Sequence, residues 1–168
     1  MNKVLFIVSY YPPFNRIASR RPAGFIKNLN RYDWEPYIIT RDWTNSTSYD
    51  KFYIDKEYEK FVLERCNPIR GEIGNAQFSD HFKSWIDGIK YPFEWTRFAI
   101  NKANLFLDKN KIDLIFSSAP TMSNHYIARY ISKKWGIPWV ADFRDVVGCL
   151  PPKNIFQNIS IYRQEKWE

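Results

Sequence analysis

The chain has 168 residues, which suits one domain with a hydrophobic core and leaves little room for a second. Hydrophobic residues make up 45% and charged residues 26%, a balance that excludes a disordered chain. The net charge of +7 attracts phosphate groups, whether these belong to nucleic acid, lipid head groups or diphosphate-linked substrates.

The cysteine and aromatic content narrows the class of protein further. Cys66 and Cys149 are the two cysteines, and they show no metal-type spacing, which argues against a disulfide scaffold or a zinc site and fits a reducing cytoplasm. Aromatic residues reach 18%, so we expect some of them at a partner surface, a ligand cleft or a membrane interface. The apolar run 4–8 is too short for a secretory signal or a membrane span.

The first elements are a strand, a rigid loop and a helix. Residues 3–9 predict a buried parallel strand because they are apolar and β-branched. Pro12-Pro13 then predicts an extended loop. Ser19 is placed to cap a helix that ends near Asn30, with Pro22 in its first turn. The outer face of this helix would carry a basic stripe of Arg16, Arg20, Lys27 and Arg31.

Strands and helices alternate along the rest of the chain. Further strands are predicted at 35–40, 61–66, 113–118 and 139–143, with loops at 41–51 and 69–76. Helices are predicted at 79–91, 93–109, 121–135 and 158–168, with a break near Pro92. Gly136 is placed as the left-handed cap of the helix before it. This order predicts an α/β fold with a doubly wound, mainly parallel sheet and helices on both faces.

Several common nucleotide-binding and catalytic motifs are missing. The chain has no G-x-x-x-x-G-K-[ST] loop, no G-x-G-x-x-G after the first strand and no G-x-S-x-G elbow. His81 and His125 are the only histidines, and neither has a second metal ligand at helical spacing. Isolated histidines of this kind are usually structural or solvent-facing.

Ligands of open α/β sheets bind at the carboxyl ends of the strands, where three unusual segments should converge. The first runs from residue 10 to residue 21 and joins the first strand to the first helix. A helix start with three arginines suits a diphosphate, although a rigid loop beside a solvated basic helix face explains the same residues. Its substrate-binding candidates are Tyr11, Pro13, Arg16, Ser19, Arg20 and Arg21.

The second and third segments add hydroxyl and acidic groups. Residues 117–125 can bond a sugar or phosphate, with Ser118 and Pro120 as binding candidates, or simply cap the helix that follows. Residues 141–145 end a buried strand with Asp142, Arg144 and Asp145, which either bind sugar hydroxyls or form a structural Asp–Arg bridge. His125 and Asp142 are the catalytic candidates.

These segments together resemble the N-terminal domain of family 4-like glycosyltransferases. The resemblance rests on the ordered set Tyr10-Tyr11-Pro12-Pro13, 17–21, 113–120 with His125, and 136–145, and it covers essentially the whole chain. It implies a GT-B fold with two Rossmann-like domains. It also implies retaining transfer of a sugar from a nucleotide donor to a glycan or lipid-linked acceptor, with no cofactor and no obligatory metal.

The resemblance also implies a division of labour between two domains. Residues 1–168 would form the Rossmann-like acceptor-side domain, and the donor-binding domain with its paired glutamates would be absent from this chain. Asn15-Arg16 stands where many family members have a Gly-Gly pair near the donor phosphates, so nearby arginines would have to replace that contact. We therefore expect the chain alone to be catalytically silent.

Other functions remain open from the sequence. Residues 83–97 mix cations with interfacial aromatics, which is typical of peripheral membrane proteins but also of an aromatic core with solvated lysines. A non-catalytic binding module or a basic nucleic-acid binder is the alternative from another class, although no RNA-binding or helix-turn-helix pattern is present. The leading hypothesis is a cytoplasmic enzyme of cell-envelope or exopolysaccharide synthesis, peripheral at the inner face of the plasma membrane.

Overall fold

The computed structural model describes residues 1–44, 48, 50, 59–66 and 80–143, with residues 80–93 as backbone only. The predicted loop at 69–76, the predicted helix at 158–168 and most of the predicted aromatic and basic stretch 83–97 therefore fall where no side chain is described. The site candidates Arg144 and Asp145, together with Cys149, lie outside the described residues as well.

A five-stranded sheet, parallel throughout, forms the centre of the molecule. Its strands are β1 (Asn2–Ile7), β2 (Trp34–Arg41), β3 (Val62–Cys66), β4 (Leu114–Ser118) and β5 (Trp139–Asp142). Their order across the sheet is β3-β2-β1-β4-β5, so β1 lies between β2 and β4. This order is that of a Rossmann-like doubly wound fold, and it confirms the fold class predicted from the sequence.

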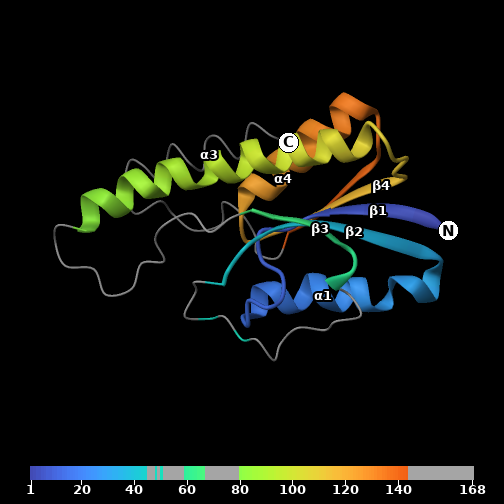
Figure 1. Ribbon diagram of the computed structural model, residues 1–168, viewed down its shortest axis with the longest axis horizontal. Helices are drawn as coiled ribbons and strands as arrows, with labels where there is room; N and C mark the ends of the chain where they lie inside the picture. Colours follow the sequence, from blue (N-terminus) through green and yellow to red (C-terminus); the bar gives the residue numbers. More distant parts are fainter. Residues whose placement is uncertain (45–47, 49, 51–58, 67–79, 144–168) are drawn as a thin grey trace.

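Helices cover both faces of the sheet (Figure 1). Helix α1 (Ile17–Leu29), followed by the 3₁₀ turn η1 (Asn30–Tyr32), lies on one face, while α3 (Asp80–Leu107) and α4 (Met122–Trp135) lie together on the other. No helix among the described residues is both long enough and apolar enough to cross a membrane.

The pleat of the sheet divides the core in two. Val4, Phe6 and Val8 pack in the cluster that faces α1, whereas Leu5 and Ile7 pack in the cluster that faces α3 and α4. Because side chains alternate between the faces of a strand, a continuously apolar strand is buried on both sides. The uninterrupted apolar run of β1 therefore fixes it as a central strand.

Helix α1 begins three residues earlier than predicted. Arg16 holds the N-cap position, so Ser19 lies in the first turn and Pro22 lies inside the helix rather than in that turn. The Ser19 hydroxyl donates to the carbonyl oxygens of Phe14 and Arg16, the second at 2.8 Å, and does not accept an amide proton as a cap would. Ser19 thus connects the first turn of α1 to the loop that precedes the helix by hydrogen bonds.

The predicted break at Pro92 is wrong, because α3 is one helix from Asp80 to Leu107. A proline removes one helical hydrogen bond and costs about 3 kcal/mol in a helix interior. The part of α3 after the proline is anchored to the sheet by Trp95, Ala99 and Ala103, none of which has measurable exposure. Tertiary packing of this kind overrides local propensity.

The apolar face of α3 does not cover all its large side chains. Leu105 is 62% exposed. Phe98 is only partly buried, and Leu107 joins Trp95 in the core.

Helix α4 ends as predicted. Gly136 adopts a left-handed conformation with φ of 66°, and its backbone N–H donates to the carbonyl oxygen of Ser132. The chain then turns through Pro138 into β5.

Candidate functional site

The candidate site lies at the point where the winding of the sheet reverses. After β1 the chain crosses to α1 on one face, and after β4 it crosses to α4 on the other, although the two strands are neighbours. Loops that diverge in this way leave a crevice beyond the carboxyl ends of the strands. Polar residues from α1, β4, α4 and β5 meet at this edge, together with Ser9 from the loop after β1.

Asp142, at the end of β5, receives hydrogen bonds from two other elements. Arg21 of α1 donates from Nε to Oδ2 at 2.8 Å and from its terminal nitrogen to Oδ1 at 2.7 Å, which is a bidentate pair. The Ser118 hydroxyl at the end of β4 donates to Oδ2 at 2.8 Å. The hydrogen bond and the charge of Asp142 raise the pKa of Arg21.

The sequence suggested an Asp–Arg pair at the end of β5, with Arg144 as the cation. Arg144 lies outside the described residues, so its pairing stays a prediction. Within the described residues Arg21, 121 positions away in the chain, pairs with Asp142. Asp142 keeps only 10% of its side-chain surface exposed, while Arg21 keeps 49%. The guanidinium therefore forms the open side of the pair.

Asn124 connects three elements just inside the site. Its side-chain oxygen accepts from the Ser9 hydroxyl at 2.7 Å and from Trp95 Nε1 at 3.0 Å. Its side-chain nitrogen donates to the Ser118 carbonyl oxygen at 2.8 Å. Asn124 was not singled out from the sequence, because a polar residue in the first turn of a helix looks like ordinary capping.

His125 is buried beside this cluster and is neutral at pH 7. Its Nδ1 lies 2.8 Å from the Ser117 hydroxyl oxygen, which in turn accepts from Trp139 Nε1 at 2.8 Å. The Ser117 oxygen has two lone pairs, so it can accept from the indole and then either donate to Nδ1 or accept from Nδ1–H; both tautomers of the imidazole are compatible with this geometry. Burial lowers the pKa of His125 to about 4, although the charge of Asp142 opposes this shift.

The second nitrogen of His125 is the most unusual polar atom of the site. Nε2 is buried and has no hydrogen-bond partner among the described residues, while the whole side chain is 3% exposed. The Phe143 ring lies over the imidazole with centroids 4.4 Å apart. A buried ring nitrogen without a hydrogen-bond partner costs free energy whether it carries the proton or the lone pair, so Nε2 is a candidate to bond a substrate.

The remaining candidates of the first segment are divided between core and surface. Tyr11, Pro13 and Ser19 are buried; Tyr11 packs in the α1-side core and the Pro13 carbonyl accepts from the Asp50 amide. Arg16 and Arg20 are exposed. These burials favour a structural role for the three residues in the loop, and their contact with a substrate stays a prediction.

The segment after β4 supplies less capping than expected. Thr121 holds the N-cap position of α4 without a side-chain hydrogen bond, and Ser118 bonds to Asp142 rather than to the helix. The Ser123 hydroxyl is buried without a partner in the described part of the chain. Pro120 is exposed. Ser118 therefore belongs to the site and not to the helix cap.

A buried arginine that the sequence did not reveal lies at the end of β2, beside Trp95 of this cluster. Arg41, at the end of β2, is 4% exposed, and its guanidinium lies 5.2 Å from the Trp43 ring centroid and 5.9 Å from that of Trp95. Trp43 in turn donates to the Ser9 carbonyl oxygen at 2.7 Å. The position of Arg41 at the end of a strand was the only signal in the sequence. Because buried arginines are rare, that signal does not predict its burial.

No group of three or more His, Cys, Asp or Glu side chains is placed to hold a metal ion in the described ranges. The positive groups at this edge are Arg21 and Arg41, and the neutral donors are hydroxyl, amide and imidazole groups. Such a set can bind an anion together with sugar hydroxyls.

Similarity to known proteins is found among solved structures. The sequence matches no protein-family profile and no curated protein. Among solved structures, the chain is similar to the C-terminal domain of a hydrogenase from Pyrococcus furiosus, with 16% identity and a TM-score of 0.48 over 83% of this chain and 90% of that one. It is also similar to a UDP-N-acetylglucosamine 2-epimerase, with 12% identity and a TM-score of 0.48 over 98% of this chain and 38% of the epimerase.

Proposed function

We propose that this chain is the acceptor-side domain of a retaining glycosyltransferase that resembles family 4. The full enzyme would move a sugar from a nucleotide-sugar donor to a glycan or lipid-linked acceptor in cell-envelope or exopolysaccharide synthesis. One observation carries the proposal: Arg21, Ser118 and Asp142 come from three separate segments and meet at the switch point of the sheet. The same three segments carry the sequence resemblance.

Each group has a task in this proposal. The open side of the Arg21 guanidinium would face the phosphate of an acceptor, because a bidentate fork suits phosphate oxygens as well as carboxylates. Asp142 would hold Arg21 in place and accept from a sugar hydroxyl. In the tautomer that carries its proton on Nε2, the neutral His125 imidazole would donate from this nitrogen to a substrate oxygen.

The donor would bind elsewhere. We propose a second Rossmann-like domain that holds the nucleotide, so that transfer occurs between the two domains and this chain alone does not catalyse it. No cofactor or obligatory metal would be needed besides the nucleotide-sugar co-substrate. We place the enzyme in the cytoplasm.

Imidazole NMR tests the proposal directly, because the chain has only two histidines. The variant His81→Gln leaves His125 as the single imidazole signal. The probes are a short-chain prenyl diphosphate-sugar, which represents a lipid-linked acceptor, and nucleotide sugars with different bases. We expect the acceptor analogue to shift the His125 signal and the nucleotide sugars to leave it unchanged.

A matched variant separates binding at the site from nonspecific attraction to a basic protein. Asp142→Asn removes the charge that holds Arg21 and should weaken the shift of the His125 signal by the acceptor analogue. Lys111→Gln removes an exposed positive charge before β4, outside the site, and should leave that shift unchanged. A His125 signal that ignores every acceptor analogue, or that answers only to nucleotides, would contradict the proposal.

A further inference from the structure

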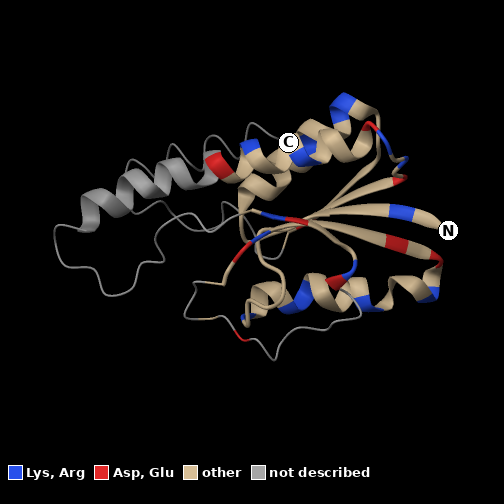
Figure 2. Cartoon of the chain, viewed as in Figure 1, with Lys and Arg blue, Asp and Glu red and all other residues tan. Residues whose placement is uncertain are grey.

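The outer surface of α1 and η1 is basic and contains no acidic residue. From Asn15 to Tyr32 the sequence has no Asp or Glu. The buried side of α1 consists of Ser19, Pro22 and Ile26, so the residues on the opposite side face solvent. We call this exposed surface the basic α1 face and define it as Arg16, Ile17, Arg20, Lys27, Arg31 and Tyr32. Figure 2 shows basic residues along α1 and none that is acidic on the helix itself.

Two cations of this face, Lys27 and Arg31, are exposed and have no acidic partner in the part of the chain that the structure describes. Arg16 donates from Nε to the Ser48 hydroxyl at 2.6 Å, a neutral partner. Asp33, the nearest acidic residue after the face, lies 3.7 Å from the amino terminus.

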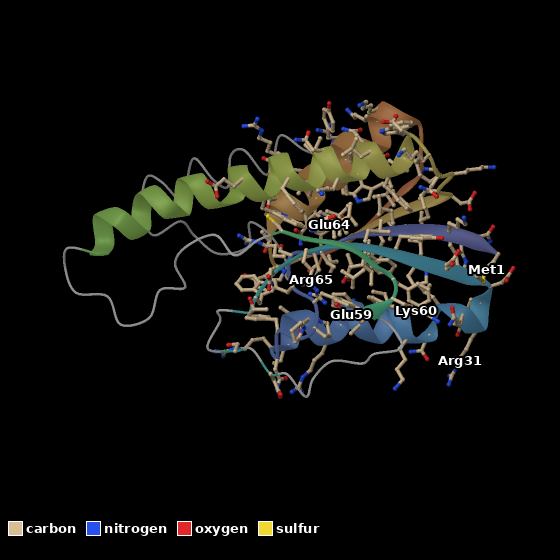
Figure 3. The ribbon with its side chains drawn as sticks, in the orientation of Figure 1. Met1, Arg31, Glu59, Lys60, Glu64 and Arg65 are labelled. Atoms are coloured by element: carbon tan, nitrogen blue, oxygen red, sulfur yellow. The ribbon has the colours of Figure 1, made fainter. Side chains whose placement is uncertain are left out.

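Bulky apolar groups stand at both ends of the basic α1 face. Ile17 and Tyr32 are each 73% exposed, and isoleucine is among the residue types most often buried. Phe25 is 40% exposed beside Arg21, whose guanidinium lies 5.3 Å from its ring centroid. Arg31 and Lys60 both lie on the α1 side of the sheet, and the acidic Glu59 on that side is paired with Arg65 (Figure 3).

We propose that the basic α1 face docks on an anionic lipid bilayer. Cations attract the negative head groups, and an exposed isoleucine and tyrosine can enter the interfacial region, where apolar and amphipathic side chains gain free energy. A nucleic acid would use the cations alone and would leave Ile17 in water, which is why the lipid surface is the better match.

This docking would hold the candidate site next to the bilayer. The Arg21 guanidinium is bound to Asp142 and follows directly on Arg20 of the face, so the edge with Ser118 lies beside the docked surface. The location differs from residues 83–97, where the sequence first suggested membrane contact. The proposal stands on charge and exposure, independently of sugar transfer.

Vesicle flotation tests the docking. The whole chain is mixed at low salt with vesicles of phosphatidylcholine alone or with added phosphatidylglycerol. The test variant is Lys27→Glu with Arg31→Glu, and the control variant is Lys111→Glu with Lys133→Glu, so that both lower the net charge of +7 by the same amount. All four residues are exposed, and thermal unfolding checks that the variants fold.

We expect the wild type and the control variant to float with the anionic vesicles and not with the neutral ones. The α1 variant should lose at least about tenfold in its partition coefficient, because each cation near such a surface contributes about 1 kcal/mol. Ile17→Ser should weaken binding without any change of charge. Equal losses in both charge-reversal variants, or no flotation of the wild type, would overturn the proposal. A wild type that binds duplex DNA but not the vesicles, with the α1 variant losing the DNA binding, would also overturn it.

Discussion

Acidification should destabilise this protein through His125. The pKa of the buried imidazole is about 4, against an ordinary value of 6.5, so the folded state resists the proton that the unfolded state accepts. A group with a depressed folded pKa of this kind supports folding fully above pH 6.5 and loses that contribution as the pH falls towards 4. Between about pH 7.5 and about pH 4.5 this loss amounts to about 2.5 kcal/mol of the free energy of unfolding.

Urea denaturation at the two pH values measures this loss, with His125→Asn as the reference. Asparagine keeps an acceptor near the position of Nδ1 for the Ser117 hydroxyl but takes up no proton. The variant is expected to be less stable at neutral pH, yet its stability should fall less on acidification than that of the wild type, by about 2.5 kcal/mol. The carboxylates titrate in both proteins, so the difference isolates the imidazole.

Two results would refute this reasoning. Equal pH dependence in wild type and variant would mean that His125 is protonated as easily in the folded state as in the unfolded state. An imidazole NMR titration in the His81→Gln background that gives a pKa near 6.5 would mean the same, because burial would then not disfavour the charge.

Four further predictions concern single residues. Asp142→Asn should lower the pKa of His125 further, because the charge of Asp142 raises it; the same NMR titration measures this. Asn124→Ala should cost about 3 kcal/mol in urea denaturation, since it leaves the Ser9 hydroxyl and the Trp95 indole N–H buried without their acceptor. Gly136→Ala should cost about 1 kcal/mol in the same assay, because φ is 66° there. Gly24→Ala should stabilise the protein by about 0.5–1 kcal/mol, since a Cβ at this helical position meets nothing within 4 Å; an unchanged or lower urea midpoint would contradict it.

The elements that could be predicted from the sequence are those whose signals are local. The apolar run of β1, the strand at 114–118 and the end of α4 at Gly136 each carry their own pattern, and the structure confirms all three. The break at Pro92 was wrong because burial of Trp95 and its neighbours, which no local pattern reveals, outweighs one lost hydrogen bond.

The site was only partly predictable for a similar reason. Ser118, His125 and Asp142 could be found because polar residues next to buried strands are conspicuous. The pairing of Arg21 with Asp142 could not be found from the sequence, since the two residues are 121 positions apart. Asn124 and Arg41 were missed because their importance depends on burial, which sequence spacing does not give.

The bond between Ser9 and Asn124 has a consequence for how the domain is assembled. These residues are 115 positions apart, so the bond cannot form before the end of β1 and the start of α4 have come together. Closing so long a loop costs conformational entropy, and the bond opens only together with the contact between these elements. A ligand held at this edge would therefore protect amides throughout the sheet from hydrogen exchange, rather than only those of the loops that it touches.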